Sequence, residues 1–117
     1  MNYLLVFLGG GLGSVLRFAI GLIMQKFSAS LPLATLLANL IACLVFALTL
    51  SIPALKQGNH ASIVFFVLSG FCGGLSTFSA FSYESFMLFR NGMALYALGN
   101  ITLSVFLCLA LFYLILK

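Results

Sequence analysis

Charged side chains are scarce in this 117-residue chain. Five Lys and Arg residues face a single acidic residue, and only 5% of the residues are charged while 64% are hydrophobic. The mean hydropathy of +1.30 lies far above that of a domain that water can solvate. The composition excludes a soluble domain and predicts an integral membrane protein surrounded by a lipid bilayer.

Side chains that carry chemistry are equally few. Glu84 is the only carboxylate side chain, His60 is the only histidine, and the three cysteines, Cys43, Cys72 and Cys108, are far apart in the sequence. These numbers exclude an acid and base pair, a zinc site and a disulfide framework. We expect no enzyme and no nucleic-acid partner, and we interpret the cysteines as small packing residues.

Long apolar runs are abundant. Each of four runs has close to the 20 residues or so that a helix needs to cross a bilayer. They are Tyr3–Met24, Leu33–Ile52, Ile63–Tyr83 and Met93–Leu116, joined by polar connections at 25–32, 53–61 and 84–92. The first run lacks the basic start and cleavage site of a signal peptide. We predict an all-α membrane protein with four transmembrane helices in one domain, residues 1–117.

The basic residues give little instruction for orientation. With four spans, one side of the membrane carries Lys56 and Lys117 and the other carries Lys26 and Arg90. Such a balance allows a chain that inserts both ways and forms an antiparallel dimer, although it is also compatible with an oppositely oriented second chain or with a mere scarcity of charge. Because four helices offer little interior, we favour dimerisation.

Arg17 lies inside the first run, within GGGLGSVLRF, in line with Gly9, Gly13 and Gly21 at four-residue spacing. A charge deep in hydrocarbon is costly, so Arg17 should face protein or water. Glycines at this spacing let a neighbouring backbone approach closely. Arg17 either extends toward the Lys26 end of its helix or forms an electropositive vestibule for an anion, and we favour the vestibule.

Two polar tracks follow one face of a helix each, with members four residues apart. They are Thr35, Asn39 and Cys43 in the second run and Asn100, Ser104 and Cys108 in the fourth. The buried amide of Asn39 needs hydrogen-bond partners, which another helix could supply. The hydroxyls could bond to their own helices, so either track indicates only weakly that a small species moves past it.

The third run contains GFCGGLSTFSAFSYE, residues 70–84. Gly70, Gly73 and Gly74 are poor helix residues, whereas Ser76 and Thr77 favour helix starts, so we predict a break between two half-helices near the middle of this run. Non-helical backbone at membrane depth must be buried in protein or line a cavity. The carbonyl groups that the break frees are suitable ligands for a cation.

Phe78 and Phe81 follow the break three residues apart, and Ser79 and Ser82 lie one position after each. An aromatic ring has a positive edge, so rings turned edge-on could contact a small anion without a basic side chain. The alternative is ordinary packing, since the chain has 13 phenylalanines.

The GGLSTFSAF core, Asn39 in ATLLANLIAC and Arg17 in GGGLGSVLRF strongly resemble the CrcB/Fluc family of fluoride channels, and the resemblance extends over essentially the whole chain. It implies a channel in the inner or plasma membrane of a microbe that lets toxic fluoride leave the cytoplasm passively. It also implies an antiparallel, dual-topology dimer with two pores. Some family members pair with a paralogue, so both a homodimer and a heterodimer stay open.

The resemblance further implies roles for individual residues. A fluoride pathway would include Phe78, Phe81, Asn39, Thr77, Ser79 and Ser104, with Arg17 in the vestibule and a central structural sodium ion on the backbone carbonyls of Gly73 and Ser76. The fourth-helix track of the family often begins with a tyrosine, whereas this chain has Asn100.

Two other functions compete with the channel. A proton-coupled small multidrug-type transporter is also about this long, but it needs an embedded carboxylate, and Glu84 lies at the edge of the third run. An accessory membrane subunit would explain the glycines in the first run, but it leaves the break, Asn39 and the fourth-helix track unexplained.

Overall fold

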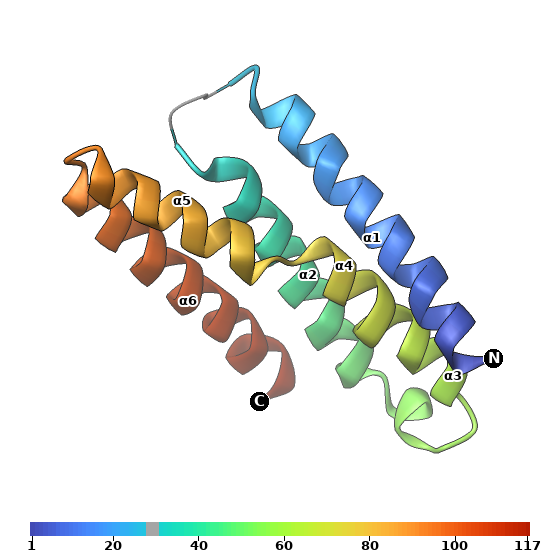
Figure 1. Cartoon of the computed structure of the whole chain (residues 1–117). Coiled ribbons are helices and arrows are strands. Elements are labelled where there is room, and N and C mark those ends of the chain that lie inside the picture. The colour runs from blue at the N-terminus through green and yellow to red at the C-terminus, as the bar shows by residue number, and fades with distance from the viewer. Residues whose placement is uncertain (28–30) are drawn as a thin grey trace.

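The computed structural model describes residues 1–27 and 31–117, and these residues form helices joined by short connections (Figure 1). Four helical stretches are long and apolar enough to cross a membrane: Asn2–Met24, Leu33–Ser51, Ala61–Arg90 and Ala94–Leu116. The prediction of an all-helical, four-span membrane protein is therefore confirmed.

The spans differ in continuity. Three of them are single helices, α1 (Asn2–Met24), α2 (Leu33–Ser51) and α6 (Ala94–Leu116). The third span consists of α3 (Ala61–Val64), the π-helical η2 (Phe65–Cys72), α4 (Gly73–Leu75) and α5 (Phe78–Arg90), and the short 3₁₀ turn η1 (Pro53–Lys56) precedes it. Its two halves meet at residues 76 and 77.

The helices form a thin, elongated bundle with extents of 51 × 31 × 21 Å. α1 packs along η2 and α4, while α6 packs against both α2 and α5. Both chain ends lie at the same end of the bundle as the connection between α2 and α3 (Figure 1). Because the bundle is so thin, many large apolar side chains point outward, toward lipid or a second subunit.

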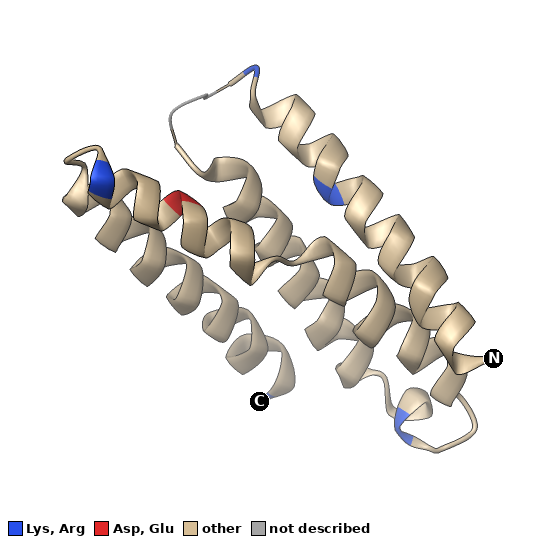
Figure 2. Ribbon diagram, in the orientation of Figure 1, with Lys and Arg blue, Asp and Glu red and all other residues tan. Residues whose placement is uncertain are grey.

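Charged residues occupy both ends of the bundle, and others lie along α1 and α5 (Figure 2). This distribution agrees with the balanced count of basic residues in the sequence. Neither end of the bundle collects most of the basic residues, which is the charge pattern on which the predicted dual topology rests.

The break in the third span lies after the glycines and not among them. The helix continues through Gly70, Gly73 and Gly74 and ends at Leu75, and only Ser76 (ψ 153°) and Thr77 (ψ 120°) are extended. A third helix broken near its middle is confirmed, but the three glycines on which the prediction rested are themselves helical. Each glycine costs a helix about 1 kcal/mol relative to alanine, and close packing against α1 offsets this cost.

Glycines from both helices make that close packing possible. A Cβ atom added at Gly70 would lie 2.9 Å from the carbonyl oxygen of Val6, and one added at Gly74 would overlap the backbone of Gly10. On α1, a Cβ atom at Gly13 would overlap the carbonyl of Phe71. In a membrane such backbone contacts are a main source of helix association.

The predicted glycine stripe on the first helix is thus confirmed in part. Gly9 and Gly13 both contact the third span. Gly21 differs, because a Cβ atom added there would have no atom of a neighbouring segment within 4 Å in the described part of the chain.

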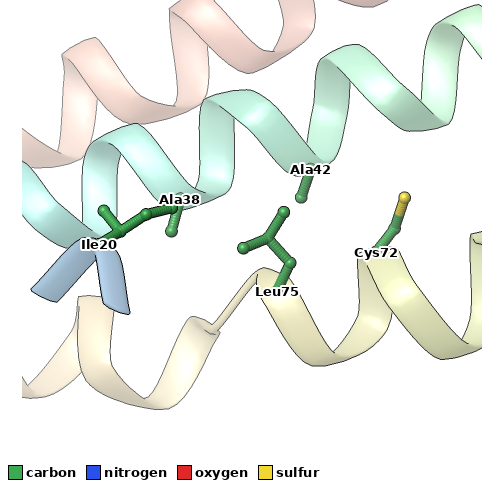
Figure 3. Packing of buried hydrophobic residues seen from close by; sticks show 5 residues of the cluster. All are labelled: Ile20, Ala38, Ala42, Cys72 and Leu75. Atoms are coloured by element: carbon green, nitrogen blue, oxygen red, sulfur yellow. The ribbon is translucent and has the colours of Figure 1, made fainter. Parts of the chain in front are cut away.

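Leu75 closes the first half of the third span and is completely buried. It points toward α2 and lies close to Ala38 and Ala42, with Ile20 and Cys72 in the same cluster (Figure 3). The small alanines leave room for the leucine. This packing holds α2 beside the break.

The third connection is shorter than the sequence predicts. Residues 84–90, expected in the connection, continue α5 as far as Arg90, and the chain turns at Asn91 and Gly92, whose φ is +75°. Ser85 and Leu88 are buried three residues apart, so packing keeps this segment helical. Glu84 consequently lies well inside a helix and not at its edge.

The close contact of α1 with the third span leads to a prediction about stability. Gly13→Ala should lower the free energy of unfolding by about 1–3 kcal/mol, because the added methyl group forces the two backbones apart. Thermal unfolding in detergent measures this change. Gly11→Ala is the matched control, since a Cβ atom there meets nothing within 4 Å in the described structure. Equal unfolding temperatures for both variants would contradict the close packing.

Candidate functional site

One side chain from α2 supports the extended backbone at the break. The amide nitrogen of Thr77 donates to Oδ1 of Asn39 at 2.8 Å, and Nδ2 of Asn39 donates to the carbonyl oxygen of Thr77 at 3.5 Å. Both backbone polar groups of Thr77 are therefore paired by Asn39. A hydrogen bond to another segment was one of the two roles that the sequence left open for Asn39. It gives the non-helical N–H and C=O groups of Thr77 partners at membrane depth, where unpaired groups are costly.

Hydroxyl groups complete the two half-helix ends. Oγ1 of Thr77 accepts from the amide of Ala80 at 3.3 Å, which caps the start of α5. Ser76 Oγ donates to the carbonyl of Cys72 at 2.8 Å. The hydroxyls of Thr77 and Ser79 lie 3.1 Å apart. The expectation that Thr77 begins a new helix is confirmed.

Arg17 reaches the other end of the break. Its Nε donates to the carbonyl oxygen of Gly74 at 3.1 Å, and the hydroxyl of Ser14 donates to the same oxygen at 3.5 Å. A cation at the C-terminal end of a helical segment is electrostatically favourable. Arg17 thus turns toward the break and does not extend toward Lys26.

A cavity of about 550 Å³ opens beside Arg17. Thr35, Thr77 and Glu84 also line it, and Thr35 Oγ1 donates to Oε1 of Glu84 at 2.6 Å. The second carboxylate oxygen, Oε2, is buried and has no hydrogen-bond partner among the described residues. This cavity therefore contains a carboxylate as well as a guanidinium.

Reasoning from the sequence did not place Glu84 in this cavity. Two spacings carry the signal: Glu84 lies seven residues after Thr77, and Thr35 lies four residues before Asn39. Both intervals are close to whole turns of a helix. Thr35 therefore lies on the same face of its helix as Asn39, and Glu84 lies on the same face of its helix as Thr77.

A second cavity, of about 350 Å³, brings together residues from three helical elements and the break. It is lined by Asn39 and Cys43 of α2, Ser76 and Thr77 of the break, Phe78 and Phe81 of α5, and Ser104, Val105, Cys108 and Leu109 of α6. Five of the six residues assigned to a fluoride pathway from sequence meet here. The sixth, Ser79, is exposed beside Thr77 and is outside this lining.

The two phenylalanines form one aromatic face. Their ring centroids are 5.8 Å apart, with the ring planes tilted by 42°. Phe81 is partly buried, whereas 80% of Phe78 is exposed in the single chain. Phe78 is therefore available to a neighbouring molecule.

The family model described as "CrcB-like protein, Camphor Resistance (CrcB)" matches residues 4–115. The chain belongs to the CrcB family. It is 39% identical over 104 residues to the "Fluoride-specific ion channel FluC" of Serratia proteamaculans, with 89% of this chain and 82% of that protein covered. It is 41% identical over 104 residues to the "Fluoride-specific ion channel FluC 1" of Yersinia pseudotuberculosis, with 87% and 80% covered.

A third relative comes from a different bacterial group. The "Fluoride-specific ion channel FluC" of Flavobacterium psychrophilum is 41% identical over 101 residues, with 86% of this chain and 82% of the relative covered. The family resemblance seen in the sequence is thus confirmed. The family is one of ion channels and not of enzymes.

The three members of the fourth-helix track of this CrcB-family chain, Asn100, Ser104 and Cys108, do not share one role. Nδ2 of Asn100 donates to the hydroxyl of Ser85 in α5 at 3.0 Å, and Ser104 Oγ donates to Oδ1 of Asn100 at 3.5 Å. Asn100 is outside the lining of the 350 Å³ cavity, while Ser104 and Cys108 are within it. Asn100 therefore ties α6 to α5 and orients Ser104, and its partner Ser85 went unrecognised in the sequence.

The carbonyls assigned to a cation are released from the helical hydrogen-bond ladder. In a continuous helix the amide of Thr77 would donate to the carbonyl of Gly73, but here it donates to Asn39. Ser76 is extended, so its carbonyl also leaves the helix direction. The hydroxyl groups of Ser76 and Thr77 lie at the same break and add further oxygen atoms. Hard cations such as sodium prefer oxygen ligands, and the residues fit such an ion.

Proposed function

We propose that this CrcB-family protein is a fluoride-selective channel through which toxic fluoride leaves the cytoplasm passively. The observation that carries the proposal is the 350 Å³ cavity, where Phe78, Phe81, Asn39 and Ser104 meet beside the break. The relatives named as fluoride-specific ion channels support the choice of ion.

The cavity offers a small anion weak contacts from several directions. The edges of Phe78 and Phe81 carry partial positive charge, while Ser104 and Thr77 provide hydroxyl donors. A permeating ion must bind well enough to enter and weakly enough to leave, and such neutral donors meet both conditions. Arg17 in the adjoining cavity attracts the anion, and Glu84 moderates that attraction.

The proposed assembly is an antiparallel, dual-topology homodimer with two pores, and pairing with a paralogue is the alternative. The exposure of Phe78, the thin bundle and the balanced basic residues all support a second subunit. The carbonyls of Gly73 and Ser76 from both subunits would hold a structural sodium ion at the dimer axis. Bound there, the ion would neutralise the partial negative charge of the facing carbonyls.

In this proposal residues 1–117 act as one channel domain. The protein would lie in the inner or plasma membrane of a microbe, since passive export protects the cytoplasm only from that membrane. The multidrug-type transporter has less support, because the relatives that this chain matches are named as ion channels.

Fluoride efflux from liposomes that contain the purified protein tests this function. We expect rapid efflux of fluoride and far slower efflux of chloride under the same gradient, measured with ion-selective electrodes. Equal chloride flux, or no fluoride flux, would exclude a fluoride-selective channel. A flux that requires a proton gradient would indicate the coupled transporter instead.

A further inference from the structure

Two thiols line the 350 Å³ cavity, and the proposed conduction of fluoride leaves them without a role. Cys43 follows Asn39 by one turn of α2, and Cys108 follows Ser104 by one turn of α6. Both polar tracks therefore end in a cysteine at the same cavity. This convergence is unlike the isolated packing role that the sequence predicts for the cysteines.

The two thiols are neighbours across the contact between α2 and α6. These helices pack against each other, and one turn further along them the rings of Phe46 and Phe112 meet edge to face with centroids 5.7 Å apart, which sets Cys43 and Cys108 at the same level of the contact. All three cysteines are free thiols. Cys72 instead belongs to the buried core cluster and is only 3% exposed; it shares a smaller cavity of about 130 Å³ with Cys43 but is not part of the 350 Å³ cavity lining.

Thiolate ligands select soft metal ions. A tetrahedral zinc site needs four ligands, which this pair does not provide. A two-coordinate soft ion needs only two: Hg²⁺ forms two Hg–S bonds, each thiol releases its proton to water, and the product is neutral. A neutral adduct suits the low dielectric of a membrane interior, where a net charge would be costly.

From the placement of these side chains we infer that Cys43 and Cys108 together form a binding site for one two-coordinate, thiophilic cation of the Hg²⁺ class. A cation held there occupies part of the cavity that Phe78 and Phe81 also line. If the cavity conducts fluoride, as proposed above, the bound cation blocks conduction. The metal site itself does not depend on that function.

Metal binding is tested on purified protein in detergent. The protein is incubated with HgCl₂ and washed with an excess of a monothiol, and bound mercury and free thiols are counted by mass spectrometry after alkylation. We expect one mercury ion per chain and two protected thiols. Cys72→Ser should retain this ion, whereas Cys43→Ser and Cys108→Ser should bind about a hundredfold more weakly, because two linked ligands act cooperatively.

Several results would overturn the site. They are the loss of all mercury in the wash, two ions bound independently to one chain, or equal loss of binding in Cys72→Ser and Cys43→Ser. In protein that has not met mercury, Zn²⁺ alone should not survive the same wash, because two thiols do not supply four ligands, and retained zinc would contradict a two-coordinate site.

Fluoride efflux supplies the second readout, with each variant compared with its own flux before HgCl₂ is added. The unsubstituted protein and Cys72→Ser should be blocked, and Cys43→Ser and Cys108→Ser should recover in the monothiol wash. If mercury stays bound to both thiols while the fluoride flux is unchanged, the cavity is not part of the conduction pathway. The proposal that the two thiols bind the metal would not be affected.

Discussion

Phe81→Ile should slow fluoride efflux about tenfold or more while the protein stays folded. The substitution keeps an apolar side chain of moderate size but removes an aromatic ring that lines the 350 Å³ cavity and whose edge carries partial positive charge. Loss of about 1.4 kcal/mol of anion stabilisation is enough, since each 1.36 kcal/mol changes a rate about tenfold. Efflux from liposomes at matched protein content measures the effect.

Phe106→Ile is the control for this experiment. Phe106 lies on α6, is 72% exposed and is not among the residues that line the cavity. Its replacement should leave the fluoride flux close to that of the unsubstituted protein. Undiminished flux in Phe81→Ile, with unchanged elution from a sizing column, would show that the ring of Phe81 only packs against its neighbours.

Asn39→Ala should have the largest effect on stability and should also impair conduction. The substitution leaves the amide and the carbonyl of Thr77 without their partner at membrane depth. An unsatisfied buried polar group costs about 1–3 kcal/mol, and two such groups are affected. We expect a clear fall in the midpoint of thermal unfolding in detergent, together with reduced fluoride efflux.

Asn100→Ala provides the comparison. It also removes an intramembrane asparagine, but the partners that lose a hydrogen bond are the hydroxyls of Ser85 and Ser104. These hydroxyls can rotate and bond to their own helix carbonyls, so the loss of stability should be smaller. If Asn100→Ala destabilises the protein as much as Asn39→Ala, then the hydrogen bonds of Asn39 to the break stabilise the protein no more than those of another intramembrane asparagine.

The glycine-rich segment shows where reading the sequence succeeded and where it failed. Thr77 was recognised as a helix start because a side-chain cap is a local interaction, formed here with Ala80. The glycines themselves stay helical although helix propensity counts against Gly70 and Gly74, because their compensation comes from Gly9, Gly10 and Gly13, some 60 residues away. Propensity cannot report such a distant contact.

The candidate site was also predicted only in part from the sequence. Periodicity placed Asn39, Cys43, Ser104 and Cys108 on defined faces of their helices, and all four line one cavity. It could not indicate that Thr35 would meet Glu84, or that Asn100 would bind Ser85, since each pair joins different helices. Which faces meet depends on how the helices cross.

By itself, the sequence of this protein determined that it lies in a membrane, how many spans it has, which family it belongs to and that its third helix is broken. These properties follow from composition, from runs of about 20 apolar residues and from local capping chemistry. Only the tertiary structure decided that the break lies at Ser76 and Thr77, that Asn39 pairs with its backbone, and that Cys43 and Cys108 line one cavity. The physical reason is that close helix contacts and buried hydrogen bonds join residues distant in sequence, and their geometry exists only once the helices have packed.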